Sequence, residues 1–198
     1  MAILTTLGAI GFYQVLQKIK GPLVKPVSVY HYEISGLIDI AAAERFKKFI
    51  SQRKAGDRVL IHIESQGGLV VSMNKIIFYL AKTRADVACY VDSHAFSAAA
   101  NILTYCKRMV VTPRALVMFH LSQICTERGL LGGCNKQKAV SPTFRPEVYK
   151  RAFRDFKRIR VLFTEQEYHD LINGKDIEIE GVEFMNRLRK AARNAKKK

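Results

Sequence analysis

Short apolar runs rich in β-branched and aromatic residues alternate along this chain with segments whose apolar residues recur at helical spacing. Val27–Ile34 alternates as a strand does, and Arg58–Glu64 reads as a second, more buried strand. Each run is followed by a segment with apolar positions three and four residues apart, Ile40–Ser51 and Val70–Lys82. The pattern therefore predicts strand, helix, strand and helix in the first half of the chain.

The same pattern continues with shorter elements. We expect a third strand at Asp86–Val91 and then a helix over Ser97–Tyr105. Strands alternating with helices of this length are typical of βαβ units, so the predicted fold class is α/β with a mostly parallel sheet and flanking helices. The remaining predictions are strands at 108–111, 116–120 and 176–179, a loop at 121–141, and helices at 146–159, 165–172 and 182–192.

The 198 residues and 48% hydrophobic content fit one folded domain, which we place at residues 27–187. Residues 1–26 are predicted to form an apolar docking segment and a linker, and residues 188–198 a basic tail. The uncharged stretch Ala2–Leu16 is short for a membrane span and lacks the basic start of a secretory signal. We therefore expect no membrane partner and no secretion.

The net charge of +16 is unevenly distributed, because Lys and Arg concentrate in Lys136–Arg160 and Arg187–Lys198. A basic tail of this kind can bind nucleic acid or an acidic partner. A solvated helix end is the alternative, and no aromatic side chains interleave with the charges of the tail. Nucleic acid therefore remains a possible partner of the tail only.

The four cysteines form neither a CxxC motif nor a Cys/His metal spacing. Cys89 and Cys106 lie in apolar runs, which predicts buried, reduced thiols. Reduced thiols indicate a reducing compartment, so we expect the cytoplasm or an organelle matrix.

Two residues between positions 91 and 120 are candidates for chemistry. Ser97 lies in a run of small residues where a strand is expected to turn into a helix, which would expose its hydroxyl and aim backbone N–H groups beside it. His120 ends an apolar strand, and a neutral imidazole is the best-matched base for a serine hydroxyl. A helix-packing serine and a hydrogen-bonded core histidine are the structural alternatives.

Ser65–Gly68 follows a predicted strand and opens a predicted helix. The adjacent Gly67 and Gly68 would let the backbone approach a substrate closely and leave N–H groups free. A structural turn, a phosphate site and an oxyanion hole are all compatible with this pattern. The absence of a GxGxxG motif argues against a nucleotide site.

Four ordered motifs resemble the Clp protease proteolytic subunit (ClpP) family, which has a crotonase-like fold and is a family of serine peptidases. They are YEISGLID, IHIESQGGLV, DSHAFSAAANIL and TPRALVMFH, and the resemblance covers residues 30–187. It implies that Ser97 is the nucleophile and His120 its base. It also implies that Gly68 and Ala98 supply the oxyanion N–H groups, with Gly67 shaping the turn.

The resemblance implies no metal and no organic cofactor. It implies polypeptide substrates, a homo-oligomeric ring and an ATP-driven unfoldase as partners. The alternatives are a catalytically weak or inactive structural subunit and a phage-encoded maturation protease.

One family feature is missing from the sequence. In the family, an aspartate that orients the histidine stands shortly before a stretch that LFTEQEY resembles here, and counting back from it reaches Arg160. The substitutes that we consider are Asp176, Asp155 and Glu165, a backbone carbonyl or a water molecule. Without an acceptor on its far nitrogen, His120 would lose control of its tautomer.

Overall fold

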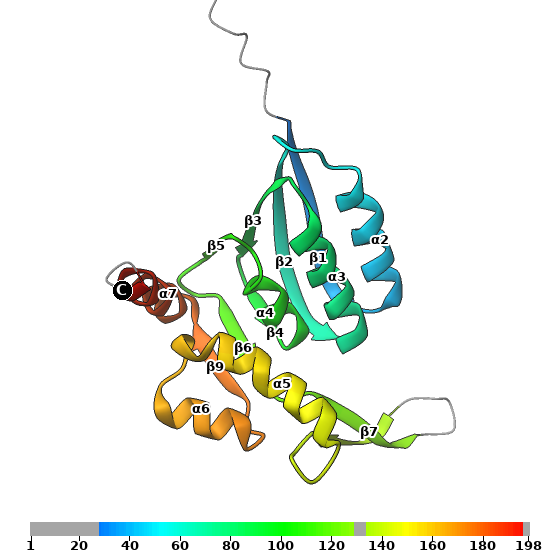
Figure 1. The fold of residues 1–198 in the computed structure, drawn as a ribbon, viewed down its shortest axis with the longest axis vertical. Helices are drawn as coiled ribbons and strands as arrows, with labels where there is room; N and C mark the ends of the chain where they lie inside the picture. The colour runs from blue at the N-terminus through cyan, green and yellow to red at the C-terminus, as the bar shows by residue number, and fades with distance from the viewer. Residues whose placement is uncertain (1–27, 129–133, 196–198) are drawn as a thin grey trace, which may run out of the picture.

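The computed structural model describes residues 28–128 and 134–195, so the predicted docking segment at 1–26 lies outside the described residues. The elements in chain order are β1 (Val29–Ile38), α2 (Ile40–Ser51), β2 (Arg58–Gly68), α3 (Val70–Lys82), β3 (Asp86–Val91), β4 (His94–Phe96), α4 (Ala98–Leu103), β5 (Arg108–Val111), β6 (Leu116–Phe119), β7 (Gln123–Arg128), β8 (Cys134–Ala139), α5 (Pro146–Arg158), the 3₁₀ turn η1 (Arg160–Leu162), α6 (Glu165–Ile172), β9 (Ile177–Glu180) and α7 (Gly181–Ala195). Helices α2 and α3 lie side by side along one flank of a curved sheet, and α5 and α6 lie beyond the ends of β4 and β6 (Figure 1).

Local sequence explains where the helices begin. Asp39 caps α2, because its carboxylate accepts a hydrogen bond of 2.7 Å from the N–H of Ala42. Thr164 and Glu167 form the predicted capping box at the start of α6. The predicted spans of α2 and α3 are confirmed to the residue.

The sheet is mostly parallel, as predicted, and it divides at β2. The strand order is β5-β3-β2-β4-β6-β9, with β1 on the other edge of β2 and β9 antiparallel to β6. β2 pairs with β3 over Arg58–His62 and then with β4 at Ser65, opposite Ala95. This division brings the carboxyl ends of β2, β4 and β6 together, which is where parallel sheets place their chemistry.

The core lies between the sheet and the helices. Val59, Ile61 and Ile63 alternate along β2 toward the helices and are at most 2% exposed. Three phenylalanine side chains are fully buried: Phe46 of α2, Phe119 of β6 and Phe184 of α7. The sheet and two helices thus each contribute an aromatic side chain to the core.

The prediction of a loop over residues 121–141 is wrong. β7 and β8 form an antiparallel hairpin there, with Gln123 opposite Ala139, and the hairpin extends away from the sheet in Figure 1. Its sequence has no sustained apolar alternation that would have marked it as a strand pair. The prediction also missed the three-residue strand β4, which is too short to show a period.

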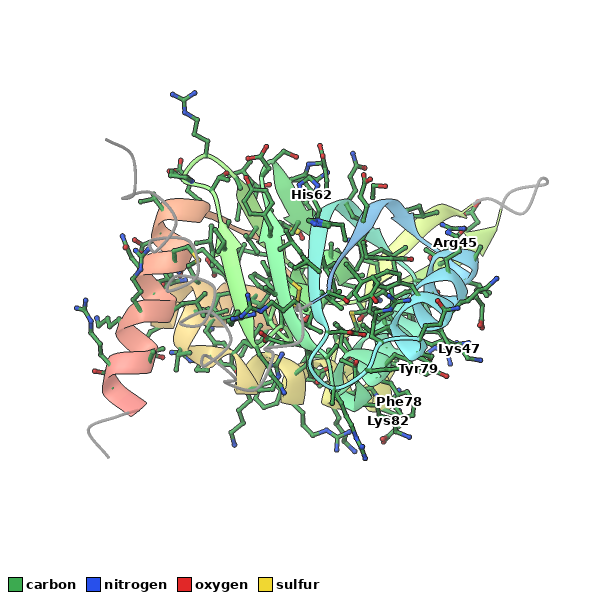
Figure 2. All side chains as sticks on the ribbon, turned by 90° about the horizontal axis from the view of Figure 1, so that it is seen from above. Arg45, Lys47, His62, Phe78, Tyr79 and Lys82 are labelled. Atoms are coloured by element: carbon green, nitrogen blue, oxygen red, sulfur yellow. A yellow bond between two sulfur atoms is a disulfide. The ribbon has the colours of Figure 1, made fainter. Side chains whose placement is uncertain are left out.

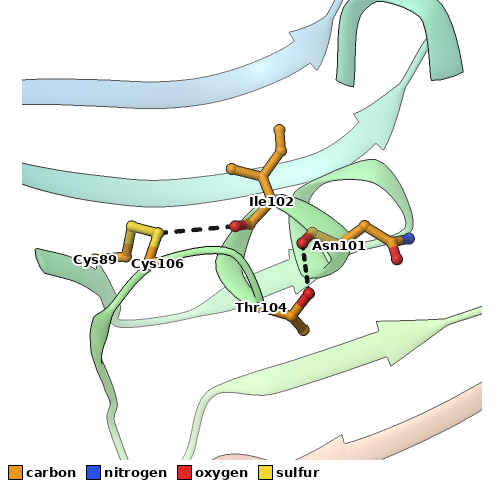
Figure 3. The surroundings of a disulfide bond; sticks show 5 residues. All are labelled: Cys89, Asn101, Ile102, Thr104 and Cys106. Atoms are coloured by element: carbon orange, nitrogen blue, oxygen red, sulfur yellow. Dashed lines mark hydrogen bonds between the residues drawn. A yellow bond between two sulfur atoms is a disulfide. The ribbon is translucent and has the colours of Figure 1, made fainter. Parts of the chain in front are cut away.

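The prediction of reduced thiols at Cys89 and Cys106 is also wrong. The two cysteines form a disulfide between β3 and the segment after α4, with Cα atoms 5.9 Å apart (Figure 3). Both residues are buried, which the apolar runs indicated correctly. Burial alone does not decide whether two thiols meet, because pairing depends on the distance that the fold sets between their Cα atoms.

Helix α7 begins at Gly181 and runs to Ala195, three residues beyond the predicted end. Arg187 fastens it to the rest of the fold, since its guanidinium donates to the Leu162 carbonyl at 2.7 Å and to the Glu167 carboxylate at 2.7 Å. Among residues 28–128 and 134–195, no helix has the length and apolar character needed to span a membrane.

Candidate active site

Ser97 lies in a sharp turn between β4 and α4. Its φ of 55° and ψ of −115° are unusual for a residue with a side chain. The turn is held by hydrogen bonds on both sides: the Ser97 N–H donates to the Met118 carbonyl at 2.8 Å, and the Asn101 side chain donates to the Ser97 carbonyl at 3.1 Å. A strained conformation that its surroundings hold in place is typical of functional turns.

His120 directly follows β6, and β6 lies beside β4. The two strands pair in parallel, with Phe96 opposite Met118, so the residues that follow them come close together. The His120 Nε2 atom lies 2.6 Å from the Ser97 Oγ atom. This is within the distance at which a histidine can take a proton from a serine hydroxyl.

Gly67 and Gly68 end β2 next to the serine turn, so the predicted glycine turn at Ser65–Gly68 is the last part of a strand. A Cβ atom on Gly67, whose φ is +97°, would lie 2.8 Å from the Ser97 Cβ atom and 3.0 Å from the Ala98 nitrogen. A Cβ atom on Gly68, whose φ is +154°, would collide with the carbonyl of Ile38. Both positions therefore require glycine, and Gly67 directly adjoins the serine turn.

Ser65 is a supporting residue whose role the sequence did not reveal. It is fully buried, its hydroxyl donates to the Gly36 carbonyl at 2.5 Å, and it accepts from the Gly67 N–H at 3.0 Å. These bonds fasten the glycine pair to the neighbouring strand β1. The sequence did contain a signal for this role, because Ser65 alternates with Ile61 and Ile63 on the core side of the strand. A hydroxyl buried there needs a hydrogen-bond partner.

A cavity of about 360 Å³ opens in front of the serine and histidine. Gly68, Ser97, Ala98 and His120 line one side of it. One face of α5 and the first turn of α3 also line it. Four of the five predicted site residues therefore line the cavity, and Gly67 does not.

The far nitrogen of His120 has no partner within residues 28–128 and 134–195. Its Nδ1 atom is buried and makes no hydrogen bond with any described residue. Arg160, which stands where the family has an aspartate, donates instead to the Phe163 carbonyl at 2.8 Å and pairs with Glu165. Glu165 is thereby engaged and its side chain is 97% exposed, which removes it as a partner of His120.

The two other candidate carboxylates lie on different sides of the site. Asp176 precedes Ile177, and Ile177 is paired with Phe119 in the antiparallel ladder of β6 and β9. Asp176 and His120 are therefore the next residues outward on adjoining strands. Asp155 of α5 instead lines the cavity; burial raises its pKa, while the guanidinium groups of Arg158, Arg154 and Arg151 act to lower it.

The other histidines are not part of this cavity. His94 has its Nδ1 atom 2.8 Å from the hydroxyl of Ser93, which also donates to Glu64 at 2.9 Å. The ring of His62 lies 5.3 Å from the ring of Tyr90 on β3, and Figure 2 shows it on the sheet, away from the labelled residues of α2 and α3. Of the described histidines, His120 alone contacts the Ser97 hydroxyl.

Comparison with known proteins supports the resemblance and the fold. Residues 38–131 match the model of the Clp protease family, which confirms the resemblance over the segment that contains the serine, the histidine and the glycine pair. No curated protein sequence matches the chain. Among solved structures, a mutant of the 1510-N membrane-bound stomatin-specific protease is similar, with a TM-score of 0.57, 12% identity, and coverage of 81% of this chain and 76% of that chain. At this identity the likeness concerns the fold, which is ClpP-like.

Proposed function

We propose that this chain, which its residues 38–131 identify as ClpP-like, is a serine endopeptidase with Ser97 as its nucleophile. The observation that supports this most directly is the distance of 2.6 Å between the Ser97 Oγ and His120 Nε2 atoms. Ser97 is held in this position by its constrained turn. A serine hydroxyl is a weak nucleophile unless a base removes its proton as it attacks. The cavity in front of the pair supplies room for the peptide group to be cleaved.

The reaction would proceed in two halves. Ser97 Oγ attacks the peptide carbonyl carbon while His120 Nε2 takes the hydroxyl proton, and the same nitrogen then protonates the leaving amine as the C–N bond breaks. Water attacks the resulting ester, again losing a proton to His120, and Ser97 regains its proton when the acid product leaves. No step needs a metal or an organic cofactor.

The N–H groups of Gly68 and Ala98 would stabilise the negative oxygen that forms in each half. Ala98 is the first residue of α4, whose initial N–H groups have no partner inside the helix. Gly67 brings the two segments together, because only a residue without a side chain allows this approach to Ala98. Donors fixed in advance at this place commonly account for a factor of about 10²–10³ in rate.

We assign the orienting role for His120 to Asp176. Its position beside His120 follows from the β6–β9 register, and it makes no hydrogen bond or ion pair with any described residue. Catalytic hydrogen bonds are often long before substrate binds and tighten in the complex. Asp176 would turn toward the Nδ1 atom when substrate closes the cavity.

The family resemblance further supports unfolded polypeptides as substrates, a homo-oligomeric ring and an ATP-driven unfoldase as the partner that delivers them. We propose these as parts of the same function, with the basic tail at residues 188–198 as a separate surface for an acidic partner or nucleic acid. A cytoplasmic location stays a prediction. The prediction of a cytoplasmic location relied partly on reduced thiols at Cys89 and Cys106, and the disulfide between these residues removes that argument.

A second candidate function is a structural subunit with little or no activity. The buried, unpartnered Nδ1 atom of His120 favours it, because an imidazole without an acceptor is poorly held in its reactive tautomer. A phage-encoded maturation protease is the third reading and would use the same Ser97 chemistry.

Labelling with a fluorophosphonate separates these functions. We expect the full-length protein to form an adduct at Ser97, located by mass spectrometry of its peptides, and to cleave an unfolded protein such as casein. Ser97→Ala should abolish both, whereas Ser93→Ala, which removes the other hydroxyl near a histidine, should abolish neither. An adduct at another residue would refute the assignment, and correct assembly without any adduct would favour the structural subunit.

A further inference from the structure

Helix α5 lines the same cavity as Ser97 and His120. Its lining residues recur three and four positions apart, so a single face of the helix is involved. They are Val148, Arg151, Ala152, Asp155 and Phe156. Three are apolar, and two carry opposite charges one helical turn apart.

Asp155 is the more enclosed of the two charged residues. Its side chain is half-buried, and no described residue gives it a hydrogen bond or an ion pair. Arg158, the arginine with the strongest effect on it, is engaged elsewhere: its guanidinium donates to the Thr104 hydroxyl at 2.7 Å and stacks 3.9 Å above the ring of Tyr105. Asp155 is therefore a partly desolvated carboxylate that makes no direct hydrogen bond or ion pair with a described residue, although Arg154 and Arg151 also act on it through space.

A carboxylate in this state is unfavourable until a cation reaches it. Burial raises the pKa of Asp155, which reflects the cost of keeping its charge away from water. A cationic group that entered the cavity would offset this cost, whereas an apolar or neutral group would leave it in place. The apolar neighbours Val148 and Ala152 would accommodate the methylene groups of a long basic side chain.

Arg151 lies on the same wall but does not cancel this effect. It is exposed, and salt screens the field of an exposed guanidinium more strongly than that of a half-buried carboxylate. Of the two charged side chains that line the cavity with Ser97 and His120, Asp155 is therefore the one whose field solvent and salt screen less.

We propose that Asp155 determines specificity by receiving a lysine or arginine side chain of the substrate, next to the bond that Ser97 cleaves. This inference rests on the proposed peptidase function. An acidic residue in the pocket beside the nucleophile is a known way for a serine peptidase to select basic residues. Here the carboxylate comes from a helix wall, and the amino group or guanidinium of the substrate replaces the missing partner.

The test uses fluorogenic peptides that differ only in the residue before the cleaved bond: lysine, arginine, leucine or glutamate. We expect kcat/KM of the wild type to be at least about 10-fold higher for lysine and arginine than for leucine. Asp155→Asn should remove this preference, so that kcat/KM for the lysine and arginine peptides falls to about that for the leucine peptide measured on the same variant. Arg151→Gln, the matched change one turn away, should keep it.

Two results would overturn the inference. An equal loss on all four peptides in Asp155→Asn would mean that Asp155 supports the fold or His120. A preference for glutamate that Arg151→Gln abolishes would mean that Arg151 governs the pocket.

The inference and the peptidase function can fail separately. Binding of the same peptides to Ser97→Ala, measured by fluorescence polarisation, does not require turnover. Tighter binding of the lysine peptide that Asp155→Asn abolishes would support the inference even for a chain that hydrolyses nothing. Equal binding of lysine and leucine peptides would refute it even if Ser97 reacts with the fluorophosphonate.

Discussion

Gly67 lies so close to Ser97 that a Cβ atom on the glycine would stand 2.8 Å from the Cβ atom of the serine. The same atom would be 2.7 Å from the Phe96 carbonyl oxygen. The end of β2 and the serine turn are thus packed directly on one another through a residue with no side chain. The position of Ser97 depends on this contact as much as on its own strand and helix.

Gly67→Ala should therefore abolish activity and destabilise the fold. The new methyl group would collide with backbone atoms that cannot move independently, and overpacking of this kind costs about 1–3 kcal/mol. Gly56→Ala is a matched control, because Gly56 has a similar φ of +94° but nothing within 4 Å of its added Cβ atom. Urea unfolding and fluorophosphonate labelling measure the two effects, and equal results for both variants would contradict the packing argument.

Asp176→Asn should lower kcat on every peptide, whatever the residue before the cleaved bond. The loss should reach up to about 10⁴-fold if the carboxylate holds the His120 tautomer, by analogy with the same change in a protease triad. Asp176→Glu should restore part of the rate. Glu178→Gln, the neighbouring acid on the same side of β9, should have little effect. If Asp176→Asn were fully active, Asp176 would not be the residue that orients His120, and other groups would have to do so.

Reduction of the Cys89–Cys106 disulfide should destabilise the protein. The bridge closes a segment of 17 residues, for which chain entropy predicts a contribution of about 3 kcal/mol. Because both residues are buried, replacing the pair with alanine should produce the same loss without a reductant. Peptide mapping without reduction should recover the two segments linked, and separate peptides with alkylated thiols would contradict the bridge.

Glu167 should make the stability of the fold depend on pH. Burial by itself raises the pKa of Glu167, but hydrogen bonds from Arg187 and Thr164 outweigh it and hold the pKa below its usual value of 4.5. The unfolded chain therefore binds this proton more readily, so the contribution is complete above about pH 4.5 and is lost as the pH falls through the lower, folded pKa.

Glu167→Gln should accordingly lower the free energy of unfolding at pH 7 by about 1–2 kcal/mol, since it weakens the bonds that hold α7 to α6. It should also make the free energy of unfolding fall less steeply as the pH is lowered from 7 to 3. Glu147→Gln is the control, because the Glu147–Lys150 pair is exposed and contributes less than about 1 kcal/mol. Denaturant unfolding between pH 3 and pH 7 measures both. If Glu167→Gln lost as much stability between pH 7 and pH 3 as the wild type does, other carboxylates would govern acid unfolding.

Much of this protein was determined by the sequence alone. Apolar periodicity predicted α2, α3, β3 and β5 with their correct bounds, because a segment that buries one face must repeat apolar residues at the spacing of its own backbone. The small residues around Ser97 and the apolar run before His120 likewise indicated the two side chains that the fold brings within 2.6 Å. The local sequence was sufficient to predict a helix or strand with one buried face, and a turn formed by neighbouring small residues.

The tertiary structure alone decided the contacts that join distant segments. The Cys89–Cys106 bridge, the fastening of Gly67 by Ser65 and the opening of Asp155 into the cavity depend on the distances between elements, which no local pattern contains. The register of β9 against β6 belongs to the same class, and it is what places Asp176 beside His120. Side-chain pairing across strands is set by the packing of the whole sheet, so the sequence could name Asp176 only as one of several candidates for the neighbour of the histidine.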